Sequence, residues 1–210
     1  MLKKLLVSFS CFAAMVSFVG CGGSTPGGIS FNPAQSAKLA MEDYDENGDG
    51  LIDFAEADKC PAIKVAFKRI DSDGNESISY TELRTRIEYF ITADSTIISG
   101  EVEIKKGSEA LKGAVVTFTP ERFMGNLIKA SKGVTDADGI AYMSGQESSF
   151  PGIYLGYYRV QVSKIEDGQE TIDAKYNTET TIGYEATDDL EDIMNVIQFT
   201  VESTSKKADS

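Results

Sequence analysis

The sequence predicts an α+β fold in separate domains, with helices in the N-terminal half and an antiparallel seven-stranded β-sandwich in the C-terminal half. Two observations predict it. Between residues 32 and 92, apolar side chains recur at the helical spacing i, i+3, i+4 and i+7. From about Ile97 the period changes to two, and short alternating segments are separated by turn residues, which is typical of the strands of a sandwich.

The first residues of the chain are typical of an export signal. Lys3 and Lys4 precede an apolar stretch from Leu5 to Val19, so residues 1–20 are expected to be a signal peptide rather than a stable membrane span. The run FVGC, which ends at Cys21, resembles the bacterial lipobox. That resemblance implies cleavage before Cys21, diacylglycerol on its sulfur and acylation of its new amino group. An ordinary signal peptide with an incidental cysteine is the alternative. Residues 21–31 are expected to form a short flexible tether.

Oxygen-bearing side chains follow at alternate positions of a twelve-residue window. Its positions 1, 3, 5, 9 and 12 are Asp45, Asn47, Asp49, Asp53 and Glu56. Calcium takes six to eight oxygens at about 2.3 to 2.6 Å, which this spacing can supply. The pattern resembles an EF-hand calcium loop, which implies a backbone carbonyl ligand from Leu51, a water-mediated contact from Asp53 and two carboxylate oxygens from Glu56. Gly50 at position 6 permits the sharp turn. The alternative is a solvated acidic turn.

The pattern recurs in a second window. The expected ligands are Asp71, Asp73, Asn75, the carbonyl of Ser77, Ser79 and Glu82. Position 6 is Glu76 where the family has glycine, so a residue with a Cβ must take a positive φ at a cost of roughly 1 kcal/mol, or the loop must distort. We therefore expect the second site to be the weaker one. Ile52 and Ile78, both at position 8, are expected to lie on short strands that bridge the two loops.

Helical patterns flank both loops and complete an EF-hand pair over residues 32–92. Asn32 and Pro33 are typical of an N-cap and first helical position, and Pro61 is expected to begin the helix before the second loop. The apolar stripes are Ala37, Ala40, Met41 and Tyr44; Ile63, Ala66, Phe67 and Ile70; and Leu83, Ile87 and Phe90. These stripes are expected to pack the loops together.

Composition excludes several functions. The chain has no His, so Ser-His and Cys-His catalytic pairs and His-ligated zinc are absent. Among its 3 cysteines, Cys11 would leave with the signal and Cys21 would carry the lipid that the lipobox resemblance implies, and Cys60 is expected to be a small buried hydrophobe. The formal net charge of -13 disfavours nucleic acid and anionic membrane surfaces as partners. The membrane would then be contacted through the lipid anchor only.

The C-terminal half is expected to be one sandwich over residues 97–203, followed by a disordered tail over 204–210. Strands are expected around 98–104, 114–118, 127–134, 140–144, 155–163, 180–186 and 195–202, with a hairpin turn from Asp136 to Gly139. The runs GEVEIKKGSEALKGAVVTFTPE and GVTDADGIAYM resemble the transthyretin-like or carboxypeptidase regulatory-like family. The run KYNTETTIGYEA resembles a segment of small planctomycete lipoproteins. Members of the family usually act as spacers or binding modules, and the resemblance implies no activity.

The expected function is that of a calcium-binding, non-enzymatic lipoprotein of the bacterial cell envelope, with Ca²⁺ as the only cofactor. Calcium would chiefly stabilise structure, because it is abundant outside the cytoplasm and weak sites would already be filled. An alternative is an adhesion or glycan-binding module that uses aromatic residues of the sandwich, Phe150, Tyr154, Tyr157 and Tyr158. A third is an accessory subunit that docks on a hydrolase.

Overall fold

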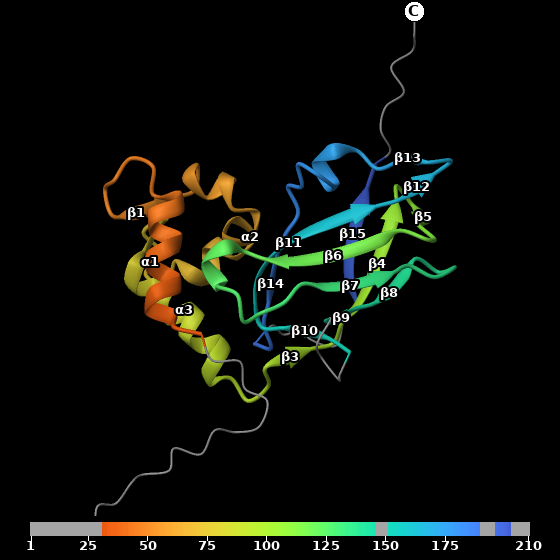
Figure 1. Ribbon diagram of the computed structural model, residues 1–210. Coiled ribbons are helices and arrows are strands. Elements are labelled where there is room, and N and C mark those ends of the chain that lie inside the picture. Colours follow the sequence, from red (N-terminus) through yellow and green to blue (C-terminus); the bar gives the residue numbers. More distant parts are fainter. Residues whose placement is uncertain (1–30, 146–150, 190–195, 203–210) are drawn as a thin grey trace, which may run out of the picture.

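The structure is a computed structural model that describes residues 31–145, 151–189 and 196–202 (Figure 1). These residues form a mix of α-helices and mainly antiparallel strands, with the helices first along the chain. The expected signal peptide, Cys21, most of the tether and the expected tail lie outside the described residues. None of the described helices has both the length and the apolar character needed to cross a membrane.

The described helices begin where local capping chemistry predicts. They are α1 (Pro33–Tyr44), α2 (Pro61–Ile70) and α3 (Tyr80–Thr92), with a 3₁₀ turn η1 (Glu56–Lys59) before α2. The Asn32 side chain accepts the Gln35 N–H at 3.2 Å, which confirms the predicted start of α1. Pro61 is the first residue of α2, as predicted. At α3, Ser79 and Glu82 form a capping box, in which each side chain bonds the other's backbone N–H.

The apolar stripes of these helices face the core. All the stripe residues of α2 and α3 are buried, and so are Ala37, Ala40 and Tyr44 of α1, while Met41 is partly buried against them. The short strands β1 (Leu51–Asp53) and β2 (Ser77–Ser79) pair antiparallel with Ile52 opposite Ile78, which confirms their predicted role. Both isoleucines are fully buried, so the two loops are joined through this pair.

Two sheets make up most of the C-terminal part (Figure 1). The five-stranded sheet has the order β14 (Gly183–Ala186), β11 (Gly156–Ser163), β6 (Val115–Pro120), β7 (Ser131–Val134) and β9 (Ser144–Gly145). The four-stranded sheet has the order β15 (Ile197–Val201), β4 (Glu101–Lys106) and β5 (Glu109–Ala110), and β8 (Ile140–Tyr142) pairs with β4 as its fourth strand. Shorter elements are the pairs β3 (Ile97–Ile98) with β10 (Ile153–Tyr154) and β12 (Ile165–Glu166) with β13 (Gln169–Glu170), and the 3₁₀ turns η2 (Arg122–Met124) and η3 (Ala174–Tyr176). Phe118 of β6 and Phe199 of β15 meet between the sheets, with ring centroids 6.1 Å apart.

The structure corrects two expectations about strand direction. β15 pairs with β4 in parallel, with Ile197 opposite Val102, so the sheets are not wholly antiparallel. No tight turn joins two strands so far apart in the sequence, and the chain reaches β15 by crossing from β14 in the other sheet, which permits a parallel pairing. The turn at Asp136–Gly139 exists, but it joins β7 to β8 in the other sheet and is not a hairpin. Three expected strands are also shorter, beginning at Ser131, Gly183 and Ile197.

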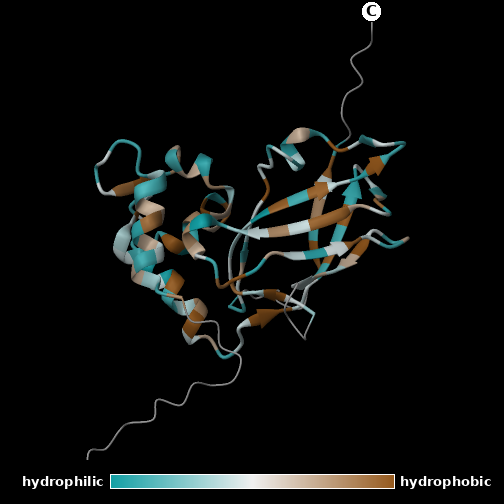
Figure 2. Cartoon of the chain, viewed as in Figure 1, coloured by the Kyte–Doolittle hydropathy of each residue, from teal (hydrophilic) through white to brown (hydrophobic). Residues whose placement is uncertain are grey.

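The helical and sheet parts are not separate bodies, because one cluster of buried apolar residues includes residues of both. Figure 2 shows hydrophobic residues along the helices as well as along the strands. Phe90 of α3 lies against Tyr157 of β11 with ring centroids 5.2 Å apart, and Tyr44 of α1 meets Phe123 of η2 at 6.2 Å. The helices therefore cover the outer face of the five-stranded sheet at its β14 and β11 end.

Candidate metal centre

The first loop is shaped by its own carboxylates. Asp45 ends α1 with an extended backbone, and its two carboxylate oxygens accept the N–H groups of Gly48 and Gly50 at 2.8 and 2.9 Å. Gly50 has φ +87°, a conformation that residues with a Cβ resist. The chain therefore turns around the Asp45 side chain.

Glu56 closes the same loop from its other end. One carboxylate oxygen accepts the N–H groups of Glu46 and Asn47 at 2.9 and 3.1 Å, and the other accepts the Asp53 N–H at 2.9 Å. Only 7% of Glu56 is exposed. Three backbone donors thus hold the position-12 carboxylate across the loop, facing the residues that precede it.

The second loop repeats this arrangement. The Asp71 carboxylate accepts the N–H groups of Gly74 and Glu76 at 2.9 and 3.0 Å. Glu82 accepts the N–H groups of Ser72 and Ser79, both at 2.9 Å. Burial opposes the charge on Glu82, but these hydrogen bonds outweigh it and lower the pKa of its carboxyl below the usual value. Glu82 is therefore ionised, and its carboxylate offers the anionic oxygen ligands that a hard cation requires.

Glu76 takes the strained conformation that the sequence predicts for position 6. Its φ is +67°, and it is one of two non-glycine residues with positive φ among the described residues. The second loop thus takes a positive φ at position 6, as the first loop does at Gly50. Gly74, at φ +72°, supplies a second left-handed turn in the same loop.

The loops differ in how closely their acids approach one another. Among the described residues, one group of three carboxylates converges. Oxygen atoms of Asp71, Asp73 and Glu82 all lie within 4.8 Å of one another. In the first loop, position 3 is an amide, Asn47, and the Asp53 carboxylate turns back to accept the Ala55 and Glu56 N–H groups, both at 2.8 Å. The more convergent acids lie in the loop that the sequence ranks as weaker.

The other predicted ligands lie within the two loops or on the short strands between them. The position-7 residues Leu51 and Ser77 are the first residues of the two paired strands. Asn75 and Asp73 are hydrogen-bonded to each other, and so are Asn47 and Asp49, both at 3.0 Å. Ser79 donates its hydroxyl to Glu82 at 2.8 Å and caps α3.

Two buried carboxylates at the interface between helices and sheet escaped the sequence analysis. Glu185 of β14 bonds Arg69 and Arg86. Glu121 accepts from Arg159 at 3.1 Å, and burial raises the pKa of the Glu121 carboxyl even against that opposite charge. No local pattern links residues so distant in sequence, and the one signal available was a lone acid inside a predicted strand.

Cys60 lies beside Glu121 and is fully buried, as predicted. Burial raises the pKa of its thiol to about 12, which keeps it protonated and unreactive near neutral pH. Tyr157 and Tyr158 are also fully buried, so neither ring offers a face to a sugar. Phe150 lies outside the described residues.

Comparisons with protein-family models, with curated proteins and with solved structures gave no match to this chain.

Proposed function

We propose that the chain is a calcium-binding, non-enzymatic lipoprotein of the bacterial cell envelope, built from an EF-hand pair followed by a β-sandwich. The observation that carries this proposal is the pairing of two twelve-residue windows through β1 and β2, each with its first and twelfth carboxylates held by its own backbone amides. EF-hands normally work in pairs, and the paired strands β1 and β2 let each loop stabilise the other.

The donor set fits calcium. Each window offers carboxylate, side-chain amide or hydroxyl, and backbone carbonyl oxygens, the hard ligands that Ca²⁺ prefers. Thiol and imidazole ligands are missing from both windows, which disfavours zinc and copper. When bound, the ion supplies positive charge that offsets repulsion among the clustered carboxylates. The chain's own residues position those carboxylates, because Asp45, Glu56, Asp71 and Glu82 are all oriented by backbone donors.

The role we propose for the ion is structural. Extracellular EF-hand modules bind calcium with dissociation constants of about 10⁻⁴ to 10⁻³ M, a range in which ambient calcium outside the cytoplasm fills the site. A ligand that binds only the folded state stabilises that state by mass action. The lipid anchor at Cys21 rests on the sequence resemblance, and mass spectrometry of the N-terminal peptide from membranes tests it.

Binding stoichiometry in matched variants tests the calcium proposal. Equilibrium dialysis against calcium is expected to give two ions per chain, falling to one in Glu56→Gln and to one in Glu82→Gln, because each change removes the bidentate position-12 carboxylate. Glu88→Gln is the control, since Glu88 lies exposed on α3 and pairs with Arg84. Two ions retained in both position-12 variants would contradict the assignment.

A further inference from the structure

A single buried carboxylate connects the two helices that flank the second loop. The side chain of Glu185 is 0% exposed. One of its oxygens accepts the Arg69 Nε–H and the other accepts the Arg86 Nε–H, each at 2.6 Å. Each carboxylate oxygen thus has its own guanidinium donor, and losing either arginine leaves one buried oxygen without its charged partner.

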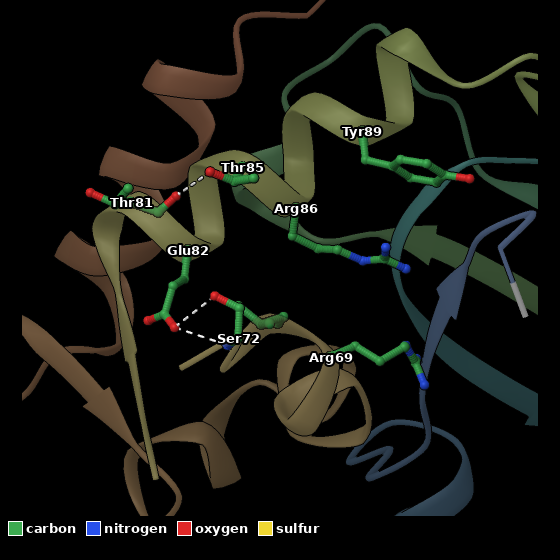
Figure 3. A pocket seen from close by; sticks show the side chains of 8 residues that line it. Arg69, Ser72, Thr81, Glu82, Thr85, Arg86 and Tyr89 are labelled. Atoms are coloured by element: carbon green, nitrogen blue, oxygen red, sulfur yellow. Dashed lines mark hydrogen bonds between the residues drawn. The ribbon is translucent and has the colours of Figure 1, made fainter. Parts of the chain in front are cut away.

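The two arginines lie close to the two ends of the second loop. Arg69 is in the last turn of α2, two residues before Asp71, and Arg86 lies one helical turn after Glu82 on α3. Figure 3 shows their side chains extending in the same direction, away from the Glu82 carboxylate. Position 1 therefore directly follows the helix that carries Arg69, and position 12 lies on the helix that carries Arg86, one turn before it.

α2 and α3 share the apolar core, but on the side of Ser72 and Glu82 a pocket separates them. A cavity of about 320 Å³ lies between them, lined by residues that include Arg69, Ser72, Glu82 and Arg86 (Figure 3). The shared contact to Glu185 of β14 therefore adds to the core packing and to the β1–β2 pair in holding the two helices together. Asp189 adds to it by accepting from Arg86 Nη1 at 2.5 Å.

The first loop also contacts the sheet part, through the buried Glu121, which accepts from Tyr44 at 3.5 Å and from Arg159 at 3.1 Å. Asp43, two residues before Asp45, pairs with Arg122, whose side chain is 70% exposed. Solvent-exposed ion pairs contribute little, at most about 1 kcal/mol. Glu185 differs from Glu121 in accepting a guanidinium from each of the two helices that flank its loop, and this connection accompanies the closer approach of Asp71, Asp73 and Glu82.

We propose that the five-stranded sheet holds the second loop in its ion-binding geometry through Glu185, so that calcium binding there and docking of α2 and α3 on β14 strengthen each other. This coupling rests on the calcium binding proposed above, and it would regulate the calcium affinity of the second loop. Coupling between two equilibria is reciprocal, so an ion that favours the docked arrangement must bind more tightly when the arrangement is intact. The sheet would compensate for the strain that Glu76 places on this loop.

Calcium affinity in a chain whose first loop carries Glu56→Gln tests the coupling, because the remaining binding event reports the second loop. Adding Glu185→Gln is expected to weaken that event by about 5-fold or more, the usual lower end of coupling between sites. The control, Glu88→Gln, removes an exposed carboxylate of α3 and is expected to leave the affinity unchanged. Arg86→Lys, which keeps the charge but loses the planar fork, is expected to weaken binding too, with the exposed Arg84→Lys as its control.

Hydrogen exchange in the unmodified protein tests the reciprocal effect without any substitution. Calcium is expected to slow amide exchange in β14 and in α2 relative to chelator-treated protein, by a factor similar to the affinity change. Unchanged affinity in folded Glu185→Gln protein, or exchange in β14 that is identical with and without calcium, would overturn the coupling while leaving calcium binding intact. Failure of the unmodified protein to bind calcium would overturn both proposals.

Discussion

Gly183 offers a direct test of how the helices sit on the sheet. It is the first residue of β14, and a Cβ built on it would lie 2.0 Å from the carbonyl carbon of Pro61 and 2.2 Å from the Ala62 N. Ordinary van der Waals contact begins near 3.4 Å, so the methyl group of Gly183→Ala requires a displacement of roughly 1.4 Å (3.4 − 2.0) at the start of α2. Both neighbours are backbone atoms, so no change of rotamer relieves the clash.

The expected cost follows from the energetics of overpacking. Inserting a methyl group into a packed interface destabilises a protein by about 1–3 kcal/mol. For a chain of this size each kcal/mol lowers the melting temperature by about 2–4 °C, which gives a fall of about 2–12 °C. Thermal denaturation followed by circular dichroism measures it, and hydrogen exchange is expected to rise in α2 and β14 together.

A matched substitution separates the steric effect from backbone strain. Gly107 has φ +61°, and a Cβ there meets nothing within 4 Å. Gly107→Ala therefore costs only the strain of a left-handed alanine, about 1–2 kcal/mol, and is expected to leave exchange in α2 unchanged. If Gly183→Ala melted at the unmodified temperature with normal exchange in α2, the close contact between this helix and β14 would be refuted.

Three further outcomes follow from single contacts. Ile52→Ala empties a fully buried position of the strand bridge and is expected to cost about 2–5 kcal/mol in urea denaturation and to weaken calcium binding at both loops; weakening at one loop only would contradict a shared bridge. Glu76→Gly is expected to raise stability by about 0.5–1 kcal/mol, because relief of the positive φ exceeds the added chain entropy, and a loss of stability would show that the φ of +67° carries no strain. The hydrogen bond from Arg86 lowers the pKa of Asp189 from 3.8 to about 2, so its stabilisation is present above pH 3.8 and is lost as pH falls through about 2. Asp189→Asn is expected to remove this part of the acid dependence, and an identical pH profile in the variant would contradict the ion pair.

Local chemistry made the helical part predictable. The N-cap at Asn32 and the start of α2 at Pro61 need only neighbouring residues, and so does the positive φ of Glu76, which follows from its place in the loop. Pairing of Ile52 with Ile78 was predictable because both stand at the same position of a repeated pattern. In each case the determining atoms lie within one loop or one turn of helix.

Long-range features were not predictable from one sequence. The parallel pairing of β15 with β4 depends on the route of the chain between sheets, which alternation of apolar residues does not encode. Alternation predicted that Tyr157 and Tyr158 face opposite sides, but not that helices cover the outer side and bury Tyr157 as well. Glu185 meets Arg69 and Arg86 across about a hundred residues, so no spacing rule identifies the contact.

Calcium titration of the chelator-treated mature chain is the most direct test of the central claim. Isothermal titration calorimetry is expected to show binding heat that saturates at two ions per chain, with a rise in melting temperature at the same calcium concentrations. Absence of heat, together with an unchanged melting temperature and unchanged NMR resonances for residues 45–56 and 71–82, would contradict the claim that these two loops bind calcium.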